Sequence, residues 1–110
     1  MESRKILGNL GEEFAAGMLI AEGFEILEQQ YRCKTGEIDI IARKQGEITF
    51  AEVKTRTDDF GGCPAEAVTN LKKNKIRRTA ELYMQSYLGD WDTLSFQVIE
   101  ITVNQIENAF

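Results

Sequence analysis

The most informative absence in this chain of 110 residues is histidine, which does not occur at all. Without imidazole the chain cannot build a histidine zinc site, a Ser-His or Cys-His nucleophilic pair, or an imidazole general base. Any chemistry must therefore come from carboxylates, lysine, hydroxyl groups or a bound metal ion.

Cysteine and long apolar runs are scarce as well. Cys33 and Cys63 are the two cysteines; no second pair exists to complete a four-ligand zinc site, so both are predicted to be free thiols. No run approaches the ~18 apolar residues of a membrane span, and the N-terminus lacks the apolar core of a secretory signal. A cytoplasmic location without membrane association is the resulting expectation.

The balance of charge is acidic, with 13 Lys and Arg against 18 Asp and Glu and a net charge of −5. Cations that neutralise phosphates dominate nucleic-acid affinity, so this balance argues against indiscriminate binding. Five of the 13 basic residues nevertheless fall between Lys72 and Arg78; a phosphate-contacting edge and a solvated helix face explain them equally well. The length and the ordinary composition predict a single domain over residues 1–110.

Hydrophobic periodicity predicts an α/β domain. The expected elements are a helix over about 3–22, a strand over 24–32, a hairpin over 36–54, a helix from about Pro64 to Tyr87, a strand over 93–103 and a short extended piece over 106–110. The second helix is expected to act as a crossover, which places the strand after it parallel to the last strand of the hairpin.

The first predicted helix carries a wide apolar stripe, which predicts that the helix is mostly covered. The stripe consists of Leu7, Leu10, Phe14, Met18 and Ala21, with Ala15, Ala16 and Leu19 beside it. Gly8, Gly11 and Gly17 each lower helix propensity by up to ~1 kcal/mol, so either the helix begins nearer Asn9 or it approaches another backbone closely. Glu12 fits a capping pair with Asn9, or alternatively is a partly buried carboxylate.

The segment over 36–54 is typical of two strands joined by a two-residue turn at Gln45-Gly46. In such a hairpin, residues equally far from the turn face each other, and successive side chains alternate between the two faces. One face is then expected to carry Glu37, Asp39, Glu52 and Lys54, and the other Ile38, Ile40, Ala51 and Val53.

This register predicts that Asp39 faces Glu52 and that Glu37 faces and holds Lys54, so three acids and one amine converge on one patch. Directly opposed like charges destabilise a strand pair by a few tenths to about 1 kcal/mol and call for a compensating cation. A divalent ion that bridges Asp39 and Glu52 supplies more charge than Lys54 does, and hard ions such as Mg²⁺ prefer oxygen ligands. The alternative is a solvated strand face on which Glu37 and Lys54 form an ordinary ion pair.

Motifs over nearly the whole chain resemble those of one protein family. They are Gly8-x-x-Gly11-Glu12, Gly23-Phe24, Gln30-Tyr31-Arg32, Gly36-Glu-Ile-Asp-Ile-Ile-Ala42, Phe50-x-Glu-Val-Lys-Thr-Arg56, Pro64-Ala-Glu-Ala-Val68 and Asn108-Ala-Phe110. Ile38-Asp39 followed by Glu52-Val53-Lys54 resembles the PD-(D/E)XK signature, with Ile where some members have Pro. Together the motifs resemble the YraN family, small bacterial proteins related in fold to archaeal Holliday-junction resolvases. The resemblance implies a restriction-endonuclease-like α-β-β-β-α-β core, a mixed sheet flanked by helices.

Carried over to this sequence, the resemblance implies that Asp39 and Glu52 bind Mg²⁺ or Mn²⁺ and that the carbonyl of Val53 completes the ligand set. It also implies that Lys54 orients the attacking water and stabilises the phosphate, and that Glu12 approaches from the first helix. A divalent ion activates water near neutral pH, so such a site needs no histidine. The expected activity is metal-dependent endonucleolytic cleavage of DNA, including branched or repair intermediates. Candidate nucleic-acid contacts are Arg32, Arg56, Lys72, Lys73 and Lys75.

Two hypotheses from other classes stay open. A non-catalytic module that binds nucleic acid or protein on the same fold is consistent with the acidic net charge. A dimerising scaffold, and hence a homodimer, is suggested by the apolar strand around Phe50 and by the terminal Phe110.

Overall fold

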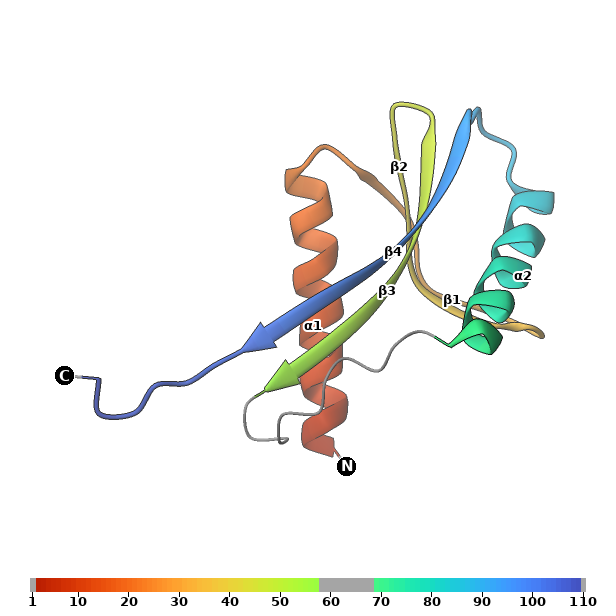
Figure 1. Ribbon diagram of the computed structural model, residues 1–110. Helices are drawn as coiled ribbons and strands as arrows, with labels where there is room; N and C mark the ends of the chain where they lie inside the picture. Colours follow the sequence, from red (N-terminus) through yellow and green to blue (C-terminus); the bar gives the residue numbers. More distant parts are fainter. Residues whose placement is uncertain (1, 58–68, 110) are drawn as a thin grey trace.

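The computed structural model describes residues 2–57 and 69–109, and Figure 1 shows how they are arranged. The elements in chain order are α1 (Glu2–Ala21), β1 (Glu25–Cys33), β2 (Gly36–Lys44), β3 (Glu47–Thr57), α2 (Asn70–Ser86) and β4 (Thr93–Val103). The predicted α/β class and the predicted α-β-β-β-α-β order are confirmed.

The four strands form one mixed sheet in the order β1-β2-β3-β4. β2 runs antiparallel to β1 and β3, whereas β4 runs parallel to β3, so α2 is the predicted crossover. The two helices lie on opposite sides of the sheet (Figure 1). β3 lies between two other strands, and its apolar side chains are taken up by the core, so this strand gives no support to a dimer.

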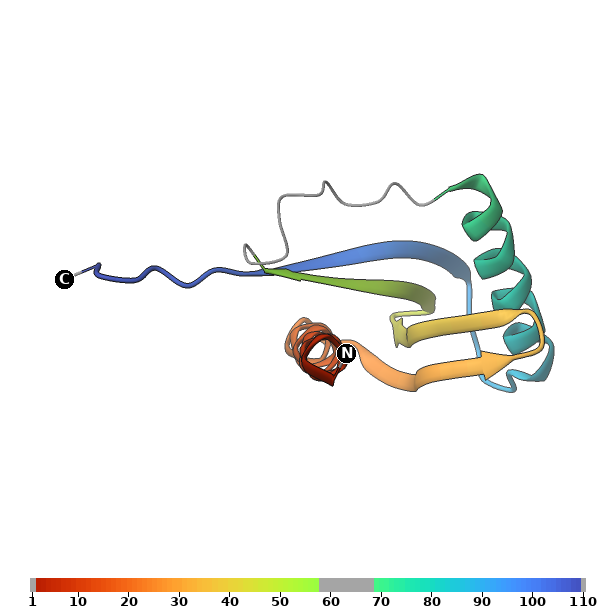
Figure 2. The same cartoon turned by 90° about the horizontal axis from the view of Figure 1, so that it is seen from below.

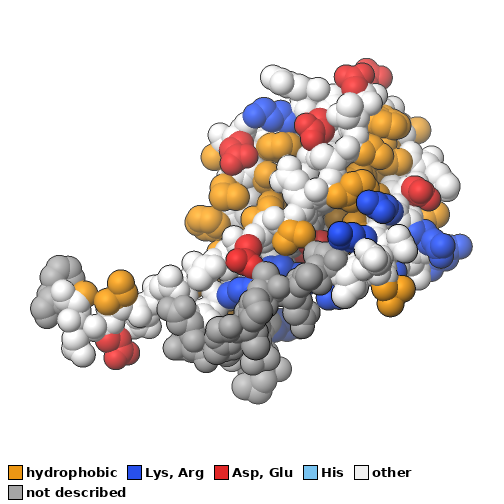
Figure 3. Space-filling view, in the orientation of Figure 1, with side chains coloured by type: hydrophobic (Ala, Val, Ile, Leu, Met, Phe, Trp, Pro, Cys, Tyr) orange, Lys and Arg blue, Asp and Glu red, His pale blue; other side chains and the backbone are white. Residues whose placement is uncertain are grey.

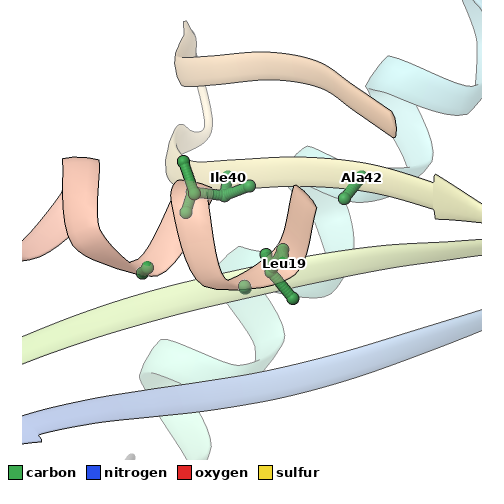
Figure 4. Close-up of a cluster of buried hydrophobic side chains, with 6 residues drawn as sticks. Leu19, Ile40 and Ala42 are labelled. Atoms are coloured by element: carbon green, nitrogen blue, oxygen red, sulfur yellow. The ribbon is translucent and has the colours of Figure 1, made fainter. Parts of the chain in front are cut away.

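Small side chains bring α1 close to the sheet. Ala15, Ala16 and Leu19 pack against Ile40, Ala42 and Ala51. Figure 4 shows Leu19 of α1 next to Ile40 and Ala42 of β2. A Cβ atom at Gly11 would collide with Oγ1 of Thr55 on β3, so this approach requires glycine. The expected close approach to another backbone is not observed: Gly11 meets a side chain of β3, and a Cβ at Gly8 or Gly17 would have no neighbour within 4 Å. The capping role of Asn9 is wrong, because α1 begins at Glu2 and Asn9 lies in its interior.

The predicted covering of the large apolar stripe of α1 is wrong. Leu10, Phe14 and Met18 are 57%, 63% and 38% exposed, and the small residues beside them face the sheet instead. The two stripes are neighbours on the helix, so periodicity alone cannot choose between them, whereas glycine and alanine allow the closer packing. An exposed apolar ridge therefore runs along α1.

The core on the other face of the sheet is larger and more aromatic. It contains Ile38, Ile41, Ile48, Phe50, Ala80 and Tyr83, with Ile76, Met84 and Tyr87 packed against them. α2 thus covers this face of the sheet with an apolar stripe. Ile38, however, lies on this side while Ile40 lies on the other, so strict alternation fails between them. On the adjacent strand β1, beside this part of β2, Gln30 has a left-handed φ of 52°. This φ interrupts the regular pleat of β1.

The start of α2 differs from the prediction. Thr69 is extended, with φ −65° and ψ 160°, and its Oγ1 accepts the N–H of Lys72 at 3.2 Å, so Thr69 is the N-cap and the helix begins at Asn70. The predicted helical start at Pro64 lies outside the described residues.

The segment over 104–109 forms no strand, which corrects the predicted extended element there. Among the described residues, the β3–β4 ladder ends with Thr57 opposite Val103. Figure 2 shows the segment leading away from the sheet. Phe110 lies outside the described residues.

Cys33 is a free thiol, as predicted, and Cys63 lies outside the described residues. Within residues 2–57 and 69–109 no helix is long and apolar enough to cross a membrane. The cytoplasmic location stays a prediction.

Candidate functional site

Asp39 and Glu52 lie where the antiparallel ladder between β2 and β3 opens. The ladder follows the predicted register and ends at Ile40 opposite Ala51. One step further, Oδ2 of Asp39 accepts the backbone N–H of Val53 at 2.7 Å. A side chain thus binds the amide of β3 at this level, the strands separate, and the two carboxyl groups meet at the opening.

The carboxyl group of Glu52 has a strongly perturbed pKa. Burial, then a hydrogen bond and charge repulsion from Asp39, raise its pKa from 4.5 to about 7, while the positive charge of Lys54 lowers it. A carboxyl group with this pKa changes its charge near neutral pH, and a cation placed beside it would favour the ionised form.

Lys54 follows Glu52 by two positions on β3, so the two side chains project from the same side of the strand. The predicted ion pair between Glu37 and Lys54 is wrong. Oε1 of Glu37 lies 3.2 Å from Nε of Arg32, its neighbour across β1. The β2–β3 ladder has already ended before Glu37, so β1 supplies the nearer partner.

Glu12 reaches the site from α1 and lines the same groove as Asp39. Burial and the charge of Asp39 raise the pKa of Glu12, while a hydrogen bond from Nε2 of Gln30 to its Oε2, at 3.3 Å, lowers it. The other oxygen, Oε1, is buried without a hydrogen-bond partner. Such an oxygen is costly unless a donor or a cation is bound beside it, which favours a partly buried carboxylate over a helix cap.

Two depressions meet at the acidic pair. Asp39 lines a groove of about 750 Å³ beside α1 and β1, and Glu52 lines a pocket of about 150 Å³ beside α2. Glu37 lines both. Lys72 and Lys75 of α2 line the smaller pocket, and Figure 3 shows Lys and Arg side chains gathered over the N-terminal part of α2. Positive charge therefore flanks Glu52 on the α2 side.

The other candidate phosphate contacts are placed differently. Arg32 lines the larger groove, where it is paired with Glu37. Nε of Arg56 lies 3.3 Å from Oε2 of Glu100 on β4. Lys73 lines neither depression, so of the five basic residues Arg32, Lys72 and Lys75 come together around the acidic pair.

The donor set of the site suits a hard divalent ion. In the part of the chain that the structure describes, no three Asp, Glu or Cys side chains are close enough to hold a metal by themselves. Mg²⁺ is usually held by one or two carboxylates, and waters and substrate phosphates complete its octahedron. Asp39 and Glu52 fit that pattern, and the carbonyl of Val53 stays a predicted ligand.

The sequence does not single out the amide side chains of the site. Asn9, Gln29 and Gln30 line the groove that contains Asp39. Gln30 adopts its left-handed φ inside β1 while its side chain holds Glu12, and a non-glycine residue in this region costs about 1 kcal/mol or more and often marks a functional site. The motif Gln30-Tyr31-Arg32 is the one feature of the sequence that points to Gln30, and it assigns no role to the side-chain amide of this residue.

The element order, the mixed sheet and the Asp39 and Glu52-Val53-Lys54 constellation define a restriction-endonuclease-like domain. A model described as "Uncharacterised protein family UPF0102" matches residues 11–101. A UPF0102 protein of Clostridium botulinum (strain Loch Maree / Type A3) is 43% identical over 107 residues, which cover 96% of this chain and 87% of the relative. One of Caldicellulosiruptor saccharolyticus is 39% identical over 117 residues, 98% of this chain and 99% of the relative. The chain belongs to the UPF0102 family, the YraN-like group of PD-(D/E)XK nuclease-like proteins.

Proposed function

We propose that the protein is a nuclease that hydrolyses phosphodiester bonds in DNA with Mg²⁺ or Mn²⁺. The observation that carries the proposal is the meeting of Asp39 and Glu52 at the opening of the β2–β3 ladder, where the pKa of Glu52 rises to about 7. Two opposed, partly buried acids are unfavourable without a cation. A site that binds a divalent ion accounts for their placement.

Each residue of the site has a role in this reaction. The ion, when bound, supplies a water of lowered pKa and offsets the charge that develops on the phosphate. Asp39 and Glu52 hold the ion through carboxylate oxygens, and the N–H of Val53 keeps Asp39 oriented before substrate binds. Lys54 stabilises the negative charge of the phosphate and orients the attacking water by a hydrogen bond.

Residues around this pair complete the proposed site. Glu12 has a buried oxygen without a protein partner beside Asp39, so a cation bound at the site would stabilise its carboxylate. Lys72 and Lys75 line the pocket next to Glu52 and are suited to receive phosphates of the bound strand.

The test is cleavage of end-labelled single-stranded, duplex and branched DNA in Mg²⁺ and in Mn²⁺. Glu52→Ala and Lys54→Met should each lower the rate by at least about 100-fold, the scale expected when a group that stabilises the transition state is lost. Lys34→Met removes an exposed lysine of the β1–β2 turn and is the matched control. Calorimetry should show Mn²⁺ binding to the wild-type protein and none to folded Glu52→Ala.

The outcomes separate the proposal from its alternative. Cleavage by Glu52→Ala at the wild-type rate indicates a contaminating nuclease. DNA binding that needs no divalent ion and is unchanged in Asp39→Ala favours the non-catalytic nucleic-acid-binding module. Absence of both cleavage and Mn²⁺ binding in the wild-type protein refutes the proposal.

A further inference from the structure

We infer that the groove beside α1 and β1 binds an unpaired nucleobase next to the phosphate that is cleaved. This inference rests on the proposed function and adds to it a binding site for a base. The preferred DNA then has strands that are separated at the site, as in a fork, a flap or a junction, and is not a continuous duplex.

The lining of the groove matches the edge of a nucleobase. The groove begins at Asp39, has a volume of about 750 Å³ and contains the amide side chains of Asn9, Gln29 and Gln30. Asn9 and Gln29 are exposed to solvent, whereas Gln30 is engaged with Glu12. An amide both donates and accepts hydrogen bonds, as the edges of the bases do. None of the described lining residues is aromatic, so the base would be held by its edge and not by stacking.

The charge of the groove disfavours a phosphate. Four carboxylates line it against two cations, Lys5 and Arg32, and Arg32 is already paired with Glu37 at 3.2 Å. With Asp39 assigned to the divalent ion, Glu12, Glu13 and Glu37 still outnumber Lys5 and Arg32, so the groove offers a phosphate no net positive charge, which a neutral base does not need. Carboxylates also accept hydrogen bonds from the amino groups of bases.

The cations suited to phosphates lie on the other side of the acidic pair. Lys72 and Lys75 line the pocket that contains Glu52. A strand that crosses between Asp39 and Glu52 would keep its phosphates toward α2 and turn a base toward α1. Taking a base out of a duplex costs free energy for unpairing and unstacking, and a base that is already unpaired avoids this cost.

The experiment measures DNA binding by fluorescence anisotropy. Ca²⁺, which also takes oxygen ligands, replaces Mg²⁺. Three labelled DNAs of equal length and equal phosphate number are compared: a duplex, a fork with unpaired arms, and the same fork with abasic sites at the first unpaired nucleotides. The fork should bind about tenfold more tightly than the duplex, and the abasic fork should lose most of that advantage although its phosphates are unchanged.

Variants identify the groove as the place where the base binds. The double change Asn9→Ala and Gln29→Ala should weaken binding of the fork about fivefold and leave binding of the duplex and the abasic fork unchanged. Gln85→Ala removes an exposed amide of α2 outside the groove, and it should change none of the three affinities.

The two proposals fail in different ways. Equal binding of the fork and the abasic fork overturns the base-binding groove and leaves the nuclease proposal standing. A double variant that weakens the binding of all three DNAs by the same factor has the same consequence. Absence of binding to every DNA, together with absence of cleavage and of Mn²⁺ binding, overturns both proposals.

Discussion

Replacing Glu52 with glutamine should stabilise the fold at pH 8 and leave it nearly unchanged at pH 4.5. Burial and Asp39 raise the pKa of Glu52 from 4.5 to about 7. A carboxyl group whose pKa is raised on folding contributes stability that is fully present below its unfolded pKa and is lost as the pH rises through its folded pKa. Glutamine resembles the protonated acid and cannot ionise, so it keeps this contribution at every pH.

The size of the effect follows from the pKa of Glu52. A change from 4.5 to about 7 corresponds to about 3.4 kcal/mol at about 1.36 kcal/mol for each pH unit. Glu52 is only partly buried, and solvent screens its repulsion from Asp39, so we expect about 1 to 2 kcal/mol at pH 8.

Urea unfolding between pH 4.5 and 8.5, in the presence of a chelator, measures this effect. The free energy of unfolding of Glu52→Gln minus that of the wild-type protein should rise from near zero to its full value as the pH increases. Glu81→Gln, which removes an exposed carboxyl group of α2, controls for the loss of one negative charge. A difference that does not vary with pH, or a destabilised Glu52→Gln protein at pH 8, refutes the account of Glu52 as a desolvated acid opposed by Asp39.

Four further predictions concern stability and are checked by thermal or urea unfolding. Gly11→Ala should destabilise the protein by about 1 to 3 kcal/mol, because its Cβ would meet Thr55, and Thr55→Ala in the same chain should restore part of the loss. Gly17→Ala, where a Cβ has no neighbour within 4 Å, should instead stabilise α1 by up to ~1 kcal/mol. Thr69→Ala should cost about 1 kcal/mol through loss of the α2 N-cap. Mn²⁺ should raise the unfolding midpoint of the wild-type protein and not that of Glu52→Gln, because an ion that binds the folded state stabilises it.

The hairpin and its acidic pair could be predicted because they follow from local rules. The Gln45-Gly46 turn sets the register as far as Ile40 opposite Ala51, and Asp39 and Glu52 interact one step beyond the end of this ladder. The crossover of α2, which makes β4 parallel to β3, follows from the order of elements and from the handedness of such connections.

The orientation of α1 could not be predicted from its pattern. Two adjacent stripes of the helix are apolar, and the choice between them depends on how closely Gly11 can approach β3. The distance of closest approach between Gly11 and β3 depends on how the helix packs on the folded sheet, and the pattern of the helix alone does not predict it. Large side chains such as Phe14 consequently face solvent.

The surroundings of the acidic pair were also beyond the sequence pattern. Ile38 leaves its expected face and packs with the α2-side core, at the level where Gln30 on β1 has a left-handed φ. Glu37 pairs with Arg32 because the β2–β3 ladder ends before it reaches Glu37. Neither the face of Ile38 nor the partner of Glu37 can be predicted from strict alternation of side chains along a strand.

The most direct test of the central claim is anomalous X-ray scattering from crystals soaked in Mn²⁺. The account predicts a peak between Asp39 and Glu52, with metal–oxygen distances of about 2.1 Å, that disappears in crystals of Glu52→Gln. Crystals that show no peak at this pair, or a peak that persists there when Glu52 is glutamine, would contradict it.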